Sequence, residues 1–249
     1  MGRLPDIHVA ADSPSRVDAA DYGDRGRPAA THCRQPLTGE NPISLHETRL
    51  NFVLGALLDS GASSVVELGC GSGAFLKCAA SQEQIRHIVG IDASEESLAV
   101  ARRELAPFID GDAQKVSLIN GSCLDENLSL AGFDAAVLVE TIEHLDPRRL
   151  STLERVLFVA YRPLTIVVTT PNKEYNVLYG LGEDELREPD HRFEWSRLRF
   201  RAWAQRLARH HGYRVIFANV GECHPTFGTP TQAARFTRHD PFMNSTCAD

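Results

Sequence analysis

Apolar residues recur in two alternating patterns from residue 44 to residue 238. Short, almost uninterrupted apolar runs are typical of strands buried on both faces, and segments with a helical period separate them. Such alternation predicts an α/β fold with a mostly parallel, doubly wound sheet. The expected strands are 65–68, 87–91, 116–120, 133–139 and 164–170, followed by two closing strands at 213–220 and 232–237.

Helical segments are expected between these strands. Ser44 and Glu47 have the spacing of a capping box, and an apolar stripe follows them until Gly61. Further helices are predicted after Gly73, over 94–105, from Asp146 and Pro147 onward, and over 196–211. The last helix is expected to turn four large side chains inward: Leu198, Phe200, Trp203 and Leu207.

Composition narrows the class of protein. With 249 residues, of which 43% are hydrophobic, the chain can form one large domain. Residues 1–42 carry few large apolar side chains and are predicted to be a disordered leader, whereas 43–249 form the domain, with roughly the last ten residues as a loose tail. A net charge of −7 argues against non-specific coating of nucleic acid.

The cysteine pattern and the hydropathy of the chain indicate the cellular compartment of the protein. The six cysteines form no C-x-x-C pair, so reduced thiols are expected. No stretch approaches the ~20 apolar residues that cross a bilayer. The sequence therefore predicts a cytoplasmic protein without a membrane partner.

A glycine-rich turn follows the first expected strand. Gly69, Gly71 and Gly73 would let the backbone turn tightly and approach a ligand. Asp92, at the end of the next strand, is placed to accept hydrogen bonds from a ribose diol. The turn alone also fits a dinucleotide site or a purely structural turn with a surface aspartate.

Glu67 before the first glycine and Ser122 after the third strand favour another cofactor. This E-x-G-x-G-x-G pattern with a downstream acid resembles the class I S-adenosylmethionine-dependent methyltransferases. The resemblance implies a Rossmann-like fold with an antiparallel last strand, and S-adenosylmethionine as cofactor. The expected cofactor-binding residues are Glu67, Gly69, Gly71, Asp92, Ser122 and Cys123.

Two carboxylates and an imidazole follow the fourth expected strand, at Glu140, Glu143 and His144. On one helical turn this spacing places them on one face, where a divalent cation would offset the repulsion. His191 offers a second imidazole from a long loop. A mixed oxygen and nitrogen set suits Mn²⁺ better than Mg²⁺, although Mg²⁺ could serve with waters. An acidic helix start with a solvated histidine explains the spacing equally well.

Four longer motifs are more specific. They are ETIEHLD (140–146), TTPNKEYN (169–176), DHRFEWSR (190–197) and GTPTQ (228–232). Together they closely resemble the small-RNA 3′-terminal 2′-O-methyltransferase family, in particular its bacterial branch, over about residues 43–238. The resemblance implies that one divalent ion, Mn²⁺ or Mg²⁺, is bound by four catalytic residues: Glu140, Glu143, His144 and His191. Glu67, where many methyltransferases have Asp, and residues 187–191 depart from the usual pattern.

The family's reaction is metal-dependent methyl transfer from S-adenosylmethionine to the 2′-hydroxyl of the 3′-terminal nucleotide of RNA, which protects that end. A metal that binds the vicinal oxygens would activate the hydroxyl, so the RNA must end in free 2′- and 3′-hydroxyls. Substrate contacts are expected from Asn172, Tyr175, Asn176, Arg192 and Arg197. Trp195 and Trp203 are expected in the core rather than as stacking platforms.

Other functions stay open at this level. A metal-dependent O-methyltransferase of small diols, a non-catalytic RNA 3′-end-binding module and, more remotely, an NAD-dependent oxidoreductase share parts of the pattern. The resemblance implies either an RNA repair kinase-ligase or a small-RNA silencing protein as a partner. Arginines between 187 and 209 would suit phosphate contacts, or would form a solvated helix face.

Overall fold

The computed structural model describes residues 44–110, 114–126, 128 and 130–239. The predicted leader over 1–42 and the predicted loose tail lie outside the described residues, and both stay predictions. Within the described part, none of the helices is long and apolar enough to cross a bilayer.

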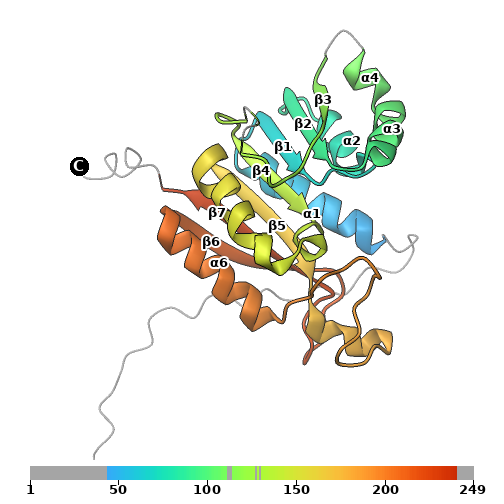
Figure 1. Cartoon of the computed structure of the whole chain (residues 1–249), viewed down its shortest axis with the longest axis vertical. Helices are drawn as coiled ribbons and strands as arrows, with labels where there is room; N and C mark the ends of the chain where they lie inside the picture. Colours follow the sequence, from blue (N-terminus) through green and yellow to red (C-terminus); the bar gives the residue numbers. More distant parts are fainter. Residues whose placement is uncertain (1–43, 111–113, 127, 129, 240–249) are drawn as a thin grey trace, which may run out of the picture. The chain divides into compact units, whose positions relative to one another are not determined.

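One seven-stranded sheet forms the centre of the described domain, with the strand order β3-β2-β1-β4-β5-β7-β6 (Figure 1). The strands from β1 to β5 are parallel, and β7 is antiparallel to both β5 and β6. The predicted α/β fold with an antiparallel last strand is therefore confirmed. The strands are β1 Ser64–Leu68, β2 His87–Asp92, β3 Val116–Asn120, β4 Ala135–Val139, β5 Thr165–Pro171, β6 Tyr213–Val220 and β7 Thr231–Arg238.

Helices cover both faces of this sheet (Figure 1). Alternate strand residues explain the two layers, because Val65 and Val137 pack with the first group of helices, whereas Val66 and Leu138 pack with the second. The first group comprises α1 Leu45–Asp59, α2 Ala74–Ala80, α3 Glu95–Glu104 and the short α4 Ala106–Ile109. The second comprises α5 Leu150–Arg155, its π-helical continuation η3 Val156–Tyr161, and α6 Arg197–His211.

The start of α1 follows the predicted capping box. The Glu47 backbone N–H donates to the Ser44 hydroxyl at 3.1 Å, and the Ser44 N–H donates to the Glu47 carboxylate at 2.9 Å. The helix expected from Asp146 begins differently. Asp146 caps a 3₁₀ turn, η2 Pro147–Arg149, and the α-helix starts only after it.

The bounds of α6 agree with the prediction, but one of its side chains has a different orientation from the one predicted. Phe200, Trp203 and Leu207 are buried as predicted. Leu198 is 79% exposed, so the prediction that it points inward was wrong. Leu198 lies two residues before Phe200, and successive helical residues are rotated by about 100°, so the two side chains point to opposite sides. Trp195 and Trp203 both lie in the core, as predicted.

The parallel strands determine where a site can form. Their carboxyl ends meet at one edge of the sheet, which is where open α/β folds bind ligands. The glycine turn follows β1 at this edge, Asp92 ends β2, and Glu140 follows β4. Segments that are far apart in the sequence therefore meet there.

Candidate active site

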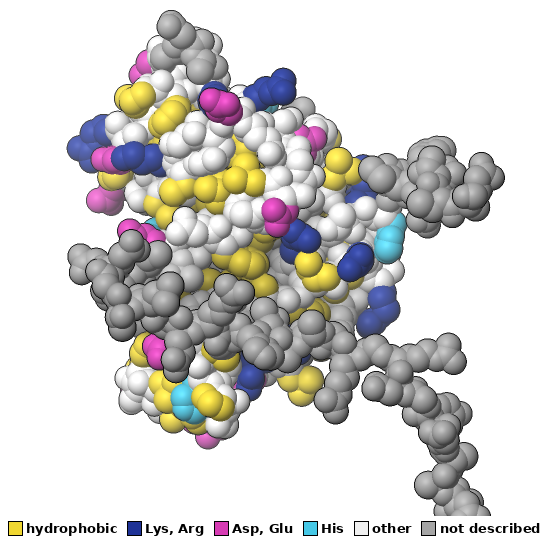
Figure 2. All heavy atoms as spheres, turned by 180° about the vertical axis from the view of Figure 1, so that it is seen from behind, with side chains coloured by type: hydrophobic (Ala, Val, Ile, Leu, Met, Phe, Trp, Pro, Cys, Tyr) yellow, Lys and Arg dark blue, Asp and Glu magenta, His cyan; other side chains and the backbone are white. Residues whose placement is uncertain are grey.

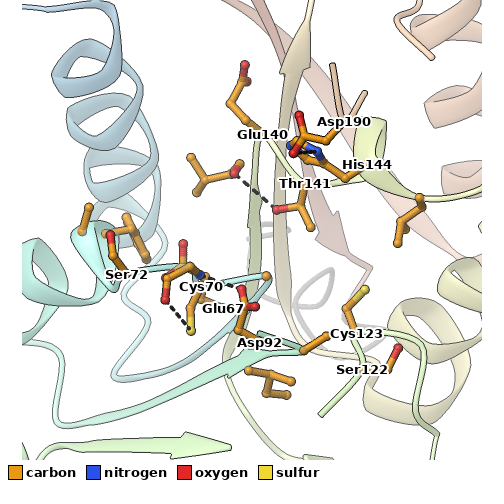
Figure 3. A pocket seen from close by; sticks show the side chains of 18 of the residues that line it. Glu67, Cys70, Ser72, Asp92, Ser122, Cys123, Glu140, Thr141, His144 and Asp190 are labelled. Carbon is orange, nitrogen blue, oxygen red and sulfur yellow. Dashed lines mark hydrogen bonds and ion pairs between the residues drawn. The ribbon is translucent and has the colours of Figure 1, made fainter. Parts of the chain in front are cut away.

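A cavity of about 600 Å³ lies at this edge of the sheet (Figure 3). This volume is within the range of sites that hold small molecules and cofactors. His144 and Asp190 line one part of the cavity, and Figure 3 shows them away from Asp92 and Ser122, which line another part. All six predicted cofactor-binding residues line it: Glu67, Gly69, Gly71, Asp92, Ser122 and Cys123.

Left-handed backbone conformations form the glycine turn. Gly69 has φ +79° and Gly71 has φ +52°, a region that L side chains rarely occupy. One oxygen of Asp92 accepts a hydrogen bond from the Gly71 N–H at 2.7 Å, and the other accepts from the Ser94 N–H at 2.8 Å. A carboxylate has about four acceptor positions, so Asp92 can hold the turn and still accept from a ribose diol.

Glu67 is buried at the wall of the same cavity. Its Oε2 atom has no hydrogen-bond partner among the described residues. Burial, and then the negative charge of Asp92, raise the pKa of Glu67 well above its ordinary value. A cationic group of a ligand would offset both effects, and the ammonium group of S-adenosylmethionine fits that requirement.

Three of the four predicted metal ligands lie together. One ligand atom each from Glu143, His144 and His191 lies within 4.8 Å of the other two. Glu143 is fully buried, and its Oε2 accepts a hydrogen bond from the Thr170 hydroxyl at 2.9 Å. Its Oε1 has no partner in the described part of the chain, and such a buried oxygen is costly unless a cation or a donor meets it. The cluster therefore fits a divalent ion.

Carboxylates hold both histidines of this cluster. Nδ1 of His144 lies 3.1 Å from Asp190 Oδ2, and Nδ1 of His191 lies 2.6 Å from Glu194 Oε1. Metal-binding histidines in proteins usually have such a partner on the second ring nitrogen. The arrangement leaves Nε2 of each ring as the ligand atom. Sequence reasoning missed Asp190 and Glu194, although both lie within three residues of His191 in DHRFEW.

Glu140 does not belong to the group of ligand atoms that lie within 4.8 Å of one another, although burial, and then the negative charge of Glu140, raise the pKa of Glu143. Glu140 has φ +50° and precedes the 3₁₀ turn η1 Ile142–His144, so the expectation that its side chain shares one helical face with Glu143 and His144 was wrong. Its Oε2 lies 3.3 Å from Nη2 of Arg49 on α1, and Figure 3 shows its carboxylate turned away from His144. Its role as a fourth metal ligand stays a prediction.

The structure does not support direct RNA contact by the two predicted asparagines. The Asn172 side chain is fully buried and donates to the carbonyl oxygens of Phe227 and Thr229 at 2.8 and 2.9 Å. Asn176 donates to Glu194 at 2.6 Å and accepts from Nε of Arg187 at 2.6 Å. Both amides therefore hold the loops around the cluster, because their polar atoms are already paired inside the protein.

The other predicted substrate residues differ in exposure. Tyr175 is buried, and Arg197 is ion-paired with Glu174. Arg192 is exposed, and its backbone N–H donates to the Glu143 carbonyl oxygen at 2.7 Å. Of the five predicted substrate residues, Arg192 is thus the one with an exposed side chain directly beside the cluster.

Positive charge is not concentrated in one large patch on the face shown in Figure 2. Lys and Arg side chains lie there in several separate places. On α6, Arg206 is paired with Glu154, and Arg199 lies over the ring of Trp195 at 5.4 Å. The positive charge on the face in Figure 2 is therefore distributed over separate side chains.

Comparison with known proteins gives consistent results. A family profile described as a methyltransferase domain matches residues 66–161. The small RNA 2′-O-methyltransferase of Mus musculus is 36% identical over 184 residues, which cover 71% of this chain and 46% of that protein. The protein of the same name from Arabidopsis thaliana is 30% identical over 214 residues, which cover 78% of this chain and 22% of that protein. The chain thus spans less than half the length of these two curated relatives.

Solved structures match the fold as well. The methyltransferase domain of bacterial CtHen1 is 39% identical, with a TM-score of 0.72, and the match covers 79% of this chain and all of that domain. The small RNA methyltransferase HEN1 is 30% identical, with a TM-score of 0.72, over 81% of this chain and 28% of that protein.

Proposed function

The chain belongs to the family of small RNA 2′-O-methyltransferases, and from this membership we propose that it transfers a methyl group from S-adenosylmethionine to the 2′-hydroxyl of the 3′-terminal nucleotide of RNA in a metal-dependent reaction. His144 carries the proposal, because it both lines the cofactor cavity and belongs to the cluster of metal-ligand atoms. A methyl donor and a metal-bound acceptor would need this juxtaposition.

Glu143, His144 and His191 would hold the metal. A bound Mn²⁺ or Mg²⁺ ion supplies Lewis acidity, which lowers the pKa of a ribose hydroxyl and favours a vicinal diol as ligand. The carboxylates of Asp190 and Glu194 keep each ring oriented through Nδ1. Because Nε2 would be occupied by the metal, neither histidine retains a free nitrogen, and we assign neither as general base.

The chain's own residues would bind and orient the methyl donor. The unpartnered oxygen of Glu67 supports binding of an ammonium group, and Asp92 supports binding of a ribose diol. Bound S-adenosylmethionine supplies the methyl group and its own leaving group, so the reaction requires no nucleophilic serine or cysteine.

Methyl transfer from labelled S-adenosylmethionine tests the proposal. The acceptors are a short RNA with a free 3′-terminal diol, the same RNA ending in 2′-deoxy or 3′-phosphate, and catechol as a small diol, each with Mn²⁺ or with EDTA. We expect transfer only to the RNA diol end and only with Mn²⁺. Transfer to catechol but to no RNA would instead favour a small-molecule enzyme, and cofactor binding without any turnover would favour a binding module.

The biological setting is a further part of the proposal. The chain would act in the cytoplasm on RNA ends with free 2′- and 3′-hydroxyls, beside an RNA repair kinase-ligase or a small-RNA silencing protein. Methylation assays on repaired RNA and on small duplex RNA, side by side, would distinguish these two settings.

A further inference from the structure

A second hollow, of about 550 Å³, adjoins the metal-ligand cluster. It lies at the turn that joins η1 to α5, and Arg192 contributes to it from the loop after His191. The hollow shares Leu124, His144, Leu145 and Arg149 with the cofactor cavity. Both spaces therefore meet at His144.

Two arginines give this hollow an available positive charge. The side chains of Arg149 and Arg192 are exposed, and among the described residues neither lies within 4.0 Å of a carboxylate oxygen. The acid in the same hollow, Asp146, is already paired, because Nε and Nη2 of Arg148 donate to it at 3.1 and 2.6 Å. Neither guanidinium group is thus paired within that distance, although the hydrogen bonds from Arg148, and to a smaller extent the nearby charge of Arg192, lower the pKa of the Asp146 carboxyl.

The backbone positions of both arginines are fixed. The Arg149 N–H donates to the Asp146 carbonyl oxygen at 2.8 Å in the 3₁₀ turn, and the Arg192 N–H donates to the carbonyl oxygen of Glu143. Arg192 is therefore tied directly to a residue of the metal-ligand cluster. These bonds fix the point from which each side chain starts, and the planar fork of a guanidinium group matches phosphate oxygens.

We propose that this hollow binds the phosphodiester of the last internucleotide linkage of the RNA, with Arg149 and Arg192 as its phosphate contacts. The inference rests on the proposed function, because that phosphate is attached to the ribose that would lie at the metal-ligand cluster. Phosphate contacts set the register of a nucleic acid without reading its sequence. The hollow would therefore position the terminal ribose of any RNA sequence.

Kinetics on two matched RNAs test this inference. One RNA has a normal last linkage, and the other has an uncharged methylphosphonate there. The proteins are the wild type, Arg149→Ala, Arg192→Ala, the double variant, and Arg103→Ala as a control. Arg103 is an exposed arginine on α3 that lines neither cavity, and its replacement removes the same charge.

We expect each single variant to raise KM for the normal RNA about tenfold, with a smaller change in kcat, and Arg103→Ala to have no effect. The methylphosphonate should raise KM of the wild type similarly and add little in the double variant. The slope of log KM against log salt should fall by about 0.7 for each lost contact. Arg149 also lines the cofactor cavity, so the affinity of each variant for S-adenosylmethionine is measured too. Arg192→Ala should leave that affinity unchanged.

Two results would overturn the inference in different ways. If the wild type methylates both RNAs with KM values within twofold of each other, the hollow does not bind this phosphate, while the proposed function stands. If the wild type methylates no RNA under any condition, the proposed function fails, and the inference fails with it.

Discussion

Gly69 has two separate reasons to lack a side chain. Its φ is +79°, and a Cβ atom there would lie 2.5 Å from Cγ2 of Thr141. Gly61 shares the first reason alone, because its φ is +73° but a Cβ atom there would meet nothing within 4 Å. The pair can therefore separate the cost of the backbone conformation from the cost of the close contact.

Gly69→Ala should destabilise the domain more than Gly61→Ala. The left-handed backbone should cost about 1–2 kcal/mol in both variants, and the contact with Thr141 should add roughly 1–3 kcal/mol at Gly69. Urea unfolding of the two variants measures the difference. Equal free energies of unfolding would show that the turn can shift to accept a methyl group.

Glu194 would act on the proposed metal through His191. Glu194→Gln should weaken Mn²⁺ binding by about 10- to 100-fold, because the amide cannot hold the Nδ1 of His191 as a carboxylate does. Titration with Mn²⁺ in the absence of substrate measures this affinity. Glu174→Gln, which alters a carboxylate paired with Arg197, is the control, and thermal melting in EDTA shows whether each variant is folded. Unchanged Mn²⁺ affinity in Glu194→Gln would mean that His191 does not need this partner.

At the scale of the elements, Asp134 joins the loop before β1 to the start of β4. Its Oδ2 accepts hydrogen bonds from the Ser63 N–H and the Ser64 N–H, each at 2.9 Å, and from the Ser63 hydroxyl at 3.0 Å. Burial alone would raise the pKa of Asp134, but these hydrogen bonds outweigh it and lower the pKa below its ordinary value. The ionised form thus stabilises the pairing of β1 with β4.

The stability that Asp134 contributes should depend on pH in one direction. Because its pKa is lowered in the folded state, the contribution is complete above the unfolded pKa of about 3.9 and disappears as the pH falls through the folded value. Asp134→Asn should reduce the free energy of unfolding at pH 7 by about 1 kcal/mol and flatten its decline below about pH 4. Chemical unfolding between pH 2 and 7 measures both effects, and parallel pH profiles for the two proteins would contradict the prediction.

At the scale of the whole domain, the proposed site is assembled from separate elements. Glu143 and His144 come from the turn after β4, His191 comes from the loop before α6, and the cofactor cavity reaches back to the turn after β1. A ligand that bridges these segments binds the folded chain only. Ligand binding should therefore raise the stability of the entire domain.

Mn²⁺ should raise the melting temperature by several degrees. At a free concentration of about 100 times Kd, the expected gain is roughly 2.7 kcal/mol, and EDTA should reverse it. Glu143→Gln should abolish the Mn²⁺ effect while keeping the shift caused by S-adenosylmethionine, since Glu143 does not line the cofactor cavity. Differential scanning calorimetry of both proteins with each ligand measures this, and an undiminished Mn²⁺ shift in the variant would place the metal elsewhere.

Local sequence was sufficient to predict the elements and the short motifs. The period of apolar residues predicted the strands and the longer helices, and the glycine pattern predicted the turn that lines the cavity after β1. The grouping of Glu143, His144 and His191 was expected from the resemblance of their motifs to a known family, and their role as metal ligands stays a prediction. The elements and the glycine turn depend on residues close together in the chain, or on the regular period of one element, so local reasoning can find them.

Only the folded domain shows which side chains of the loops around the site are buried and which are exposed. There Glu140 turns toward Arg49, Asn172 and Asn176 are buried among loop carbonyls and carboxylates, and Arg149 and Arg192 stay exposed at one hollow. A loop has no period that reveals which side chains face inward, and its polar atoms must find partners that are distant in the sequence. Whether a given polar residue meets the ligand or supports the protein is therefore decided by packing between segments.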